Sequence, residues 1–121
     1  MINSVYILEA KNGSSRELIN LLKLISGRTA YQIGCLSSRV WVDKDTSQVM
    51  LMETWKTLDD LILHINSKLF RRLLAAMEMG ASKPEVKFFE CNSERGMDFI
   101  EEVLLYDKGM PEEKKISTKE R

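Results

Sequence analysis

The hydrophobic pattern in the first third of the chain predicts a strand followed by a helix. A β-branched and aromatic run near the start ends at Asn12-Gly13, which indicates a strand over residues 3 to 11. Ser14 and Glu17 have the spacing of a helix-capping box, and Gly27 is expected to close the helix. Between them, apolar residues recur at the spacing of one helix face: Leu18, Leu21, Leu22 and Ile25.

Two more strands and a second helical region are predicted in the middle of the chain. Residues 35 to 43 alternate and residues 49 to 55 have β-type composition, so the turn-rich residues 43 to 46 should join them as an antiparallel hairpin. Thr57 is the expected N-cap of the next helix, and Asn66-Ser67 interrupts its apolar stripe. The stripe comprises Leu58, Leu61, Ile62, Ile65, Leu69, Phe70, Leu73, Leu74 and Met77.

A last strand over residues 86 to 91 completes the order βαββαβ. This order predicts an α+β, ferredoxin-like fold with a four-stranded antiparallel sheet and both helical regions on one face. On the third strand, Met50 and Met52 point to one face and Leu51 to the other. Because the helices can cover only one apolar face, a second copy of the chain is the simplest cover for the other. We therefore expect a homodimer.

The chain after the last strand is predicted as an appendage to one domain over residues 1 to 92. Asp98 with Glu101 fits the cap of a short helix in an extension over residues 93 to 108, although a strand would also fit. Residues 109 to 121 are rich in charged and poor in apolar side chains. We expect them to form a mobile charged tail.

Composition and charge narrow the classes of protein to which the chain can belong. A chain of 121 residues with 44% hydrophobic residues fits a single globular domain. Its 18 Lys and Arg balance 18 Asp and Glu, so no basic surface for nucleic acid is expected. The start lacks the pattern of a signal peptide, and no apolar run is long enough for a membrane span. We expect a cytoplasmic protein that binds neither nucleic acid nor membrane.

The sequence offers few groups for a metal or a cofactor. It has no glycine-rich phosphate loop and no close pair of metal ligands, so neither a bound cofactor nor a metal ion is expected. Cys35 and Cys91 are far apart, and both are interpreted as half-buried thiols, with a disulfide or a reactive thiol as the alternatives.

The single histidine, His64, lies at the edge of the second helical stripe. It fits either a half-buried side chain bonded to the backbone or a proton acceptor for a phenolic ligand, because imidazole titrates near neutral pH. Tyr6 and Trp55 fit either the core or contacts to a substrate. We take His64 as the candidate catalytic residue, and Tyr6 and Trp55 as the candidate substrate-binding residues.

The stretch from Met52 to Leu58, followed by Leu61, His64, Ser67 and Phe70, resembles the signature of the antibiotic biosynthesis monooxygenase family. In that signature an acidic residue and Trp end a strand, and the next helix carries His, Ser and an aromatic residue. Gly34-Cys35 resembles the family's Pro-Gly start of the second strand, with Ile33 in place of the usual proline. The resemblance covers roughly residues 3 to 92.

This resemblance implies a dimeric α+β barrel with a pocket between the sheet and the helices, near His64. Several members oxidise quinols or polycyclic phenols with dioxygen and bind no metal, flavin or haem. The haem-degrading branch uses Asn, Trp and His at positions that match Tyr6, His64 and Leu74, and these departures argue against haem degradation.

The leading hypothesis is therefore a cofactor-independent monooxygenase acting on an aromatic, phenolic or quinol substrate, with His64 assisting removal of a phenolic proton. The alternative is a non-catalytic ligand-binding or stress-associated dimer on the same fold. An enzyme should have a closed apolar cavity with polar groups near His64, whereas side chains should fill this space in a scaffold.

Overall fold

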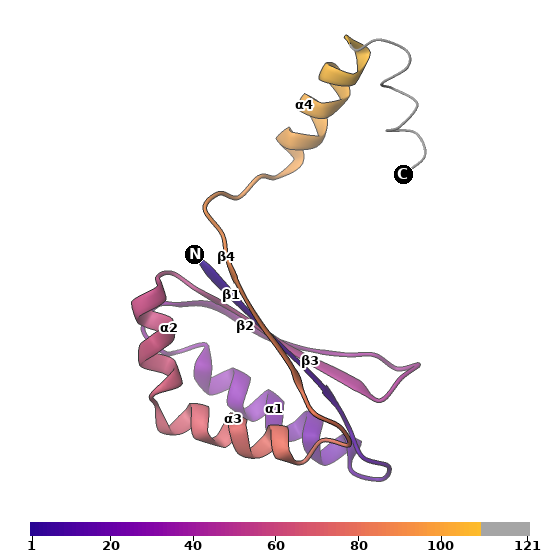
Figure 1. The fold of residues 1–121 in the computed structure, drawn as a ribbon, viewed down its shortest axis with the longest axis vertical. Coiled ribbons are helices and arrows are strands. Elements are labelled where there is room, and N and C mark those ends of the chain that lie inside the picture. Colours follow the sequence, from indigo (N-terminus) through magenta and orange to yellow (C-terminus); the bar gives the residue numbers. More distant parts are fainter. Residues whose placement is uncertain (110–121) are drawn as a thin grey trace. The chain divides into compact units, whose positions relative to one another are not determined.

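The computed structural model describes residues 1 to 109, in which helices α1 to α3 lie on one face of a four-stranded antiparallel sheet (Figure 1). This confirms the predicted α+β, ferredoxin-like fold. In chain order the elements are β1 (Ile2–Glu9), α1 (Ser15–Thr29), β2 (Cys35–Val42), β3 (Gln48–Trp55), α2 (Leu58–Ile65), α3 (Lys68–Glu78), β4 (Glu85–Glu90) and α4 (Met97–Lys108).

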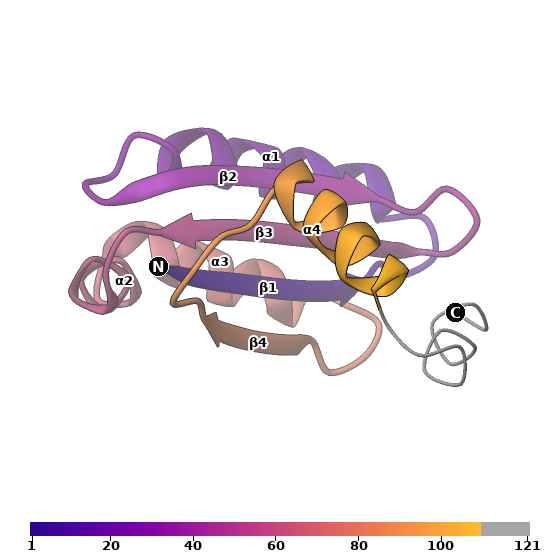
Figure 2. The ribbon, with the colours of Figure 1, turned by 90° about the horizontal axis from the view of Figure 1, so that it is seen from above.

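The sheet has the strand order β2-β3-β1-β4, and Figure 2 looks onto it with α1 and α3 behind. In the register, Ser4 on β1 lies opposite Glu53 on β3 and Phe88 on β4. Two residues further along β1, Tyr6 lies opposite Leu51 and Val86. Side chains of paired residues point to the same face, so the register places these side chains together on one side of the sheet.

The second helical region consists of two helices that meet at the predicted interruption. Thr57 caps α2, because its hydroxyl accepts a hydrogen bond from the Asp60 backbone N–H at 3.2 Å. At the junction, the Ser67 hydroxyl donates to the His64 carbonyl at 2.6 Å and accepts from the Phe70 N–H at 3.2 Å. Ser67 therefore fixes the chain between His64 and Phe70, which both point inward.

Helix α1 differs from its prediction at both ends. Ser14 is the N-cap, but its side chain bonds the Lys11 carbonyl at 3.1 Å and makes no capping bond, so the expected box with Glu17 does not form. The helix also continues past Gly27 to Thr29. Gly27 does not adopt positive φ, the conformation with which glycine usually ends a helix.

The two faces of the sheet carry different side chains. The inward face of β1 and β3 is buried against the helices and comprises Ile2, Ser4, Tyr6, Leu8, Val49, Leu51, Glu53 and Trp55. The opposite face, called the open face below, carries the apolar residues Val5, Ile7, Trp41, Met50, Met52 and Phe89. Trp41 and Phe89 are about half exposed. The predicted presence of apolar residues on both faces is thus confirmed.

Within the described residues, a second unit begins at Asn92 and contains α4. Within it, Arg95 pairs with Glu102 at 3.6 Å, and its guanidinium lies 5.1 Å from the ring centroid of Phe99. The predicted charged tail lies, from residue 110 on, outside the described residues. No helix in the described part of the chain is long and apolar enough to cross a membrane.

Candidate functional site

Buried polar side chains in the described residues fall into two groups. Ser26 and Thr29 have partners: the Ser26 and Ser38 hydroxyls lie 2.7 Å apart, and the Thr29 hydroxyl donates to the Ile25 carbonyl at 2.8 Å. The other group has polar atoms without any hydrogen-bond partner in the protein, and we call it the polar cluster. It comprises Ser4 Oγ, Tyr6 Oη, both carboxyl oxygens of Glu53, Trp55 Nε1 and His64 Nε2.

The gathering of these atoms marks the interior between the sheet and α2 as the candidate site. Buried polar groups in native proteins nearly always have partners, and groups without them need water or a ligand to satisfy them. Strand geometry accounts for the gathering, because Ser4 and Glu53 are cross-strand partners and Tyr6 and Trp55 each follow two residues later on the same face. His64 completes the cluster from α2.

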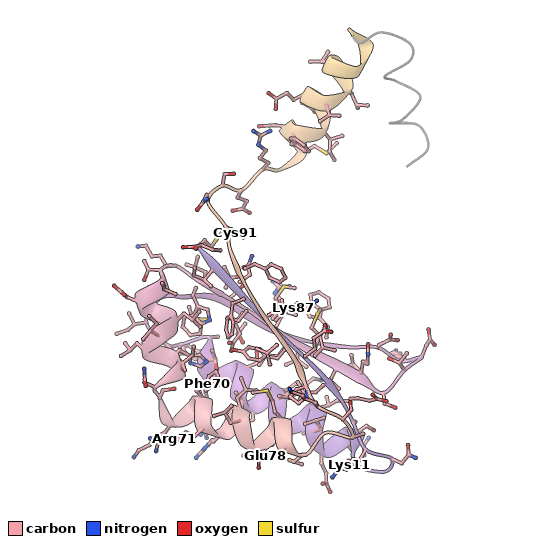
Figure 3. The ribbon with its side chains drawn as sticks, viewed as in Figure 1. Lys11, Phe70, Arg71, Glu78, Lys87 and Cys91 are labelled. Atoms are coloured by element: carbon pink, nitrogen blue, oxygen red, sulfur yellow. The ribbon has the colours of Figure 1, made fainter. Side chains whose placement is uncertain are left out.

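Aromatic rings enclose His64. Its imidazole stacks on the Trp55 indole, with 4.5 Å between the ring centroids and an angle of 28° between the planes. The Phe70 ring meets it edge-on at 5.4 Å. Figure 3 shows Phe70 on the side of α3 that faces the sheet, with Arg71 on the outer side. The imidazole is therefore 2% exposed and held in one plane.

The two nitrogens of His64 have different surroundings. Nδ1 is hydrogen-bonded to the Gln32 side-chain oxygen. When Nδ1 donates to this oxygen, the neutral ring presents a lone pair at Nε2. Nε2 lies 3.7 Å from a carboxyl oxygen of Glu53, which is too far for a hydrogen bond. Glu53 and His64 thus face one another directly.

Gly34 holds the loop that supplies Gln32. Its φ is +81°, and a Cβ atom here would lie 2.1 Å from the Asp60 Cγ at the start of α2. Its carbonyl accepts a hydrogen bond from the Lys56 N–H at 2.8 Å. Only glycine permits both this conformation and this close approach, so Gly34 sets the distance between the loop and His64.

Burial shifts the pKa values of the ionisable groups in the polar cluster in the directions that favour their neutral forms. It raises the pKa of Glu53 to about 7, against a smaller opposing effect of the nearby Trp55 indole. It lowers the pKa of His64 to about 4. Burial and the Glu53 charge raise the pKa of Tyr6, while Ser4 opposes the shift. Between about pH 4 and 7 the pair is therefore a protonated carboxyl group and a neutral imidazole, and not an ion pair.

Two surface pockets lie near the polar cluster, and one of them is lined by a member of it, His64. One, of about 280 Å³, reaches the outer side of His64 and is lined by Gln32, Ile33, Asp60, Leu63, His64, Asn66 and Ser67. The other, of about 360 Å³, lies between α2 and β4 and is lined by Ile2, Leu58, Leu61, Ile62, Ile65, Phe88 and Glu90. Ile2 and Leu61 also pack on Trp55, and the Phe88 ring meets the Tyr6 ring edge-on at 6.1 Å. The second, mostly apolar pocket is thus one side chain away from the cluster.

The structure brings the three candidate residues into one region. His64 and Trp55 are in direct contact, and Phe70 links them to Tyr6 at a centroid distance of 6.4 Å. The interpretation of His64 as a half-buried side chain bonded to the backbone is wrong, because its partner is the Gln32 side chain and it is almost fully buried. Leu74 is on α3 and about half exposed.

Two site residues were not among the candidates. Glu53 could have been found, because strand alternation from Leu51 to Trp55 places this carboxylate on an apolar inward face. Gln32 could not, since a polar residue in a loop carries no signal that it will bond a histidine on another element.

The described residues contain two free thiols and no cluster of metal ligands. Cys35 and Cys91 are unpaired and partly buried, which confirms the interpretation as thiols. Burial and the Glu53 charge raise the pKa of Cys35 to about 11, against a smaller effect of the Ser37 backbone. No group of three or more His, Cys, Asp or Glu side chains within residues 1 to 109 is arranged to hold a metal ion.

Solved structures share this fold at low sequence identity. A protein from Deinococcus radiodurans is 20% identical and has a TM-score of 0.72, with 80% of this chain and 98% of that chain covered. The Mycobacterium tuberculosis protein Rv0793 is 17% identical with a TM-score of 0.70, covering 78% and 98% of the two chains. A conserved protein from Methanosarcina mazei Go1 is 23% identical with a TM-score of 0.67, covering 74% and 90%.

The match by sequence is to a family and not to an individual relative. No curated protein has significant similarity to this chain. The family model described as antibiotic biosynthesis monooxygenase matches residues 1 to 76, which contain β1 to β3, α1, α2 and all five residues of the polar cluster. The chain belongs to the antibiotic biosynthesis monooxygenase family.

Proposed function

We propose that the protein is a cofactor-independent monooxygenase that oxidises an aromatic, phenolic or quinol substrate with dioxygen at the polar cluster. One observation carries this proposal: six buried polar atoms without partners lie among aromatic rings. A planar apolar molecule with a hydroxyl group matches both features, since its ring can pack on aromatic side chains and its hydroxyl can bond the free polar atoms.

In the proposed reaction the substrate supplies all four electrons. One oxygen atom of dioxygen enters the product, and the other leaves as water with two hydrogens from the substrate. Removal of the phenolic proton is the step in which the protein takes part, because the resulting anion gives electrons to dioxygen more readily. We assign this step to the region of His64, and contact with the substrate ring to Tyr6 and Trp55.

We also propose that the working unit is a homodimer in the cytoplasm. The open face supports the dimer, because, beside Arg39 and Lys87, it carries six apolar side chains that α1 to α3 do not cover: Val5, Ile7, Trp41, Met50, Met52 and Phe89. A second copy presenting the same face would cover it by an isologous contact. The two sites would then lie on the outer, helical sides of the joined sheets.

The packing of the site supports a second candidate function. Tyr6 and Trp55 have no exposed surface, so side chains fill much of the space between the sheet and α2. This is the arrangement expected of a non-catalytic ligand-binding or stress-associated dimer. For such a protein, ligands should change Trp fluorescence without any consumption of oxygen.

Oxygen uptake separates the two functions. Purified protein is mixed with a panel of hydroquinones and anthrols, with and without added metal or flavin, and dioxygen is followed with an electrode. The proposed function predicts uptake for at least one substrate, unchanged by metal or flavin. Ligand binding without uptake for every member of the panel would favour the second function.

A further inference from the structure

Glu53 is the group of the polar cluster that lies best for proton transfer. It has no exposed surface, yet neither of its carboxyl oxygens has a hydrogen bond of normal geometry, and the approach of the Trp55 indole N–H only partly offsets the effect of burial on its pKa. A buried carboxyl group without any partner is costly and is rarely kept unless it serves a function. The hydroxyl of Ser4, its cross-strand partner, is also free, so two groups can bond one hydroxyl of a ligand.

His64 is less suited to take the proton itself. Trp55 and Phe70 contact its ring, and Gln32 occupies Nδ1. The remaining nitrogen, Nε2, faces Glu53 at 3.7 Å, so it can receive a proton or a hydrogen bond from this carboxyl group. The pKa directions agree, because burial makes Glu53 the stronger base of the two.

We propose that Glu53 is the catalytic residue that accepts the phenolic proton, and that Gln32 is a positioning residue that keeps the Nε2 lone pair of His64 directed at Glu53. This inference rests on the proposed function and names the base within it. The O–H bond of the substrate breaks, an O–H bond forms on Glu53, and the electron pair stays on the phenolate oxygen. The new carboxylic acid then faces His64 Nε2 across 3.7 Å, and a small approach of the two groups lets it donate a hydrogen bond that stabilises it.

The titratable groups around Glu53 set the pH range of this transfer. They are Tyr6 on β1, Cys35 on β2 and His64 on α2, and the Glu53 charge raises the pKa of both Tyr6 and Cys35. Near neutral pH all three are uncharged, so Glu53 is the group that changes charge. Proton acceptance should therefore increase as pH rises through about 7.

The first test uses a nitrophenol under anaerobic conditions, because its visible absorption distinguishes the neutral phenol from the phenolate and needs no oxidation. The measurement is made just above the Glu53 pKa of about 7, where Glu53 can accept a proton. Wild-type protein should bind the nitrophenol and increase its phenolate fraction over that of the free compound. Glu53→Gln should bind it with the phenolate fraction reduced, and Glu53→Asp should restore part of the ionisation. Absence of binding, or equal ionisation by wild type and Glu53→Gln, would overturn the proposal.

The second test separates Gln32 from Glu53. Gln32→Leu removes the acceptor at Nδ1, so His64 can change tautomer and present an N–H to Glu53, which stabilises the carboxylate. The phenolate fraction of bound nitrophenol should then fall, because a stabilised carboxylate accepts the phenolic proton less readily, while the dissociation constant of the phenol changes less than threefold. Ser82→Ala, a change at an exposed hydroxyl outside the polar cluster, should leave both quantities as in wild type. An unchanged phenolate fraction for Gln32→Leu would contradict the positioning role.

Oxygen uptake distinguishes failure of this inference from failure of the proposed function. If wild type oxidises a quinol and Glu53→Gln does so with an unchanged pH profile, the proposed function stands and the base is another group. If wild type ionises bound nitrophenol through Glu53 but oxidises no substrate, the assignment of Glu53 as proton acceptor stands and the monooxygenase function fails.

Discussion

The imidazole of His64 lies flat against the indole of Trp55, with 4.5 Å between their centroids, and turns Nε2 towards Glu53. This contact joins the end of β3 to α2, the two elements that carry the family signature. The spacing of the signature thus has a structural reason. Glu53 and Trp55 are on the buried face of the strand, and His64 is a buried residue in the last turn of α2.

We predict that His64→Phe keeps the fold but lowers quinol oxidation by roughly 10²-fold, the usual contribution of a group that assists proton transfer. The phenyl ring can keep the contacts with Trp55 and Phe70, whereas it has no nitrogen to face Glu53. Circular dichroism and thermal melting check the fold, and oxygen uptake checks the rate.

A matched substitution shows whether the loss is specific. Leu24→Phe introduces the same ring at an exposed position of α1 that lines neither pocket and should leave the rate within a factor of two of wild type. Full activity of His64→Phe would show that His64 only fills space.

The fold could be predicted because it depends on patterns within each element. Alternation from Val49 to Trp55 and the helical stripe around Leu61 and Phe70 are local signals, and the order of elements limits how they can pack. Gly27 misled the prediction because a glycine can remain helical when its neighbours favour the helix.

The site could be predicted only in part. His64 was identified as the single histidine at the edge of a helical stripe and Trp55 as an aromatic residue at a strand end, but the partner of His64 depends on a loop held by the positive φ of Gly34. Gln32 and His64 are 32 residues apart in the sequence, and their contact depends on how the loop packs against α2. No periodic pattern in the sequence indicates such a contact.

We predict opposite pH dependences of stability for variants of the buried pair. The Glu53 pKa rises from 4.5 to about 7 on folding, so its contribution to stability is full below pH 4.5 and is lost as pH rises to 7. The His64 pKa falls from 6.5 to about 4, so its contribution is full above pH 6.5 and is lost as pH falls to 4. In wild type the two slopes cancel where the ranges overlap, between about pH 4.5 and 6.5.

Each variant should reveal how the remaining group of the pair changes the free energy of unfolding with pH. His64→Phe should lose about 1.4 kcal/mol of stability per pH unit as pH rises from 4.5 to 7. Glu53→Gln should lose a similar amount per unit as pH falls from 6.5 to 4. Urea unfolding at several pH values measures both slopes. Parallel profiles for the two variants would show that the groups are not shifted as described.

We predict that Gly34→Ala destabilises the protein by more than 1 kcal/mol, because its φ is +81° and the new methyl group would collide with Asp60. Displacement of the loop should also break the hydrogen bond between Gln32 and His64. Thermal melting measures the stability, and the NMR shifts of the imidazole report the loss of the bond.

Gly27→Ala is the matched control, since it is the same substitution within α1, where a Cβ meets no atom within 4 Å. It should stabilise the protein by about 0.5 to 1 kcal/mol, because alanine favours a helix more than glycine does. Equal effects of the two substitutions would contradict the role given to Gly34.

We predict that a charge on the open face separates the dimer. Met52→Glu should give a folded monomer at micromolar concentration, because a carboxylate in an isologous contact meets the same charge on the second copy. Light scattering measures the mass of each species. Leu24→Glu introduces the same charge at an exposed position on α1 and should leave the dimer intact. If wild type is a monomer, or Met52→Glu stays a dimer, the open face is not the interface between copies.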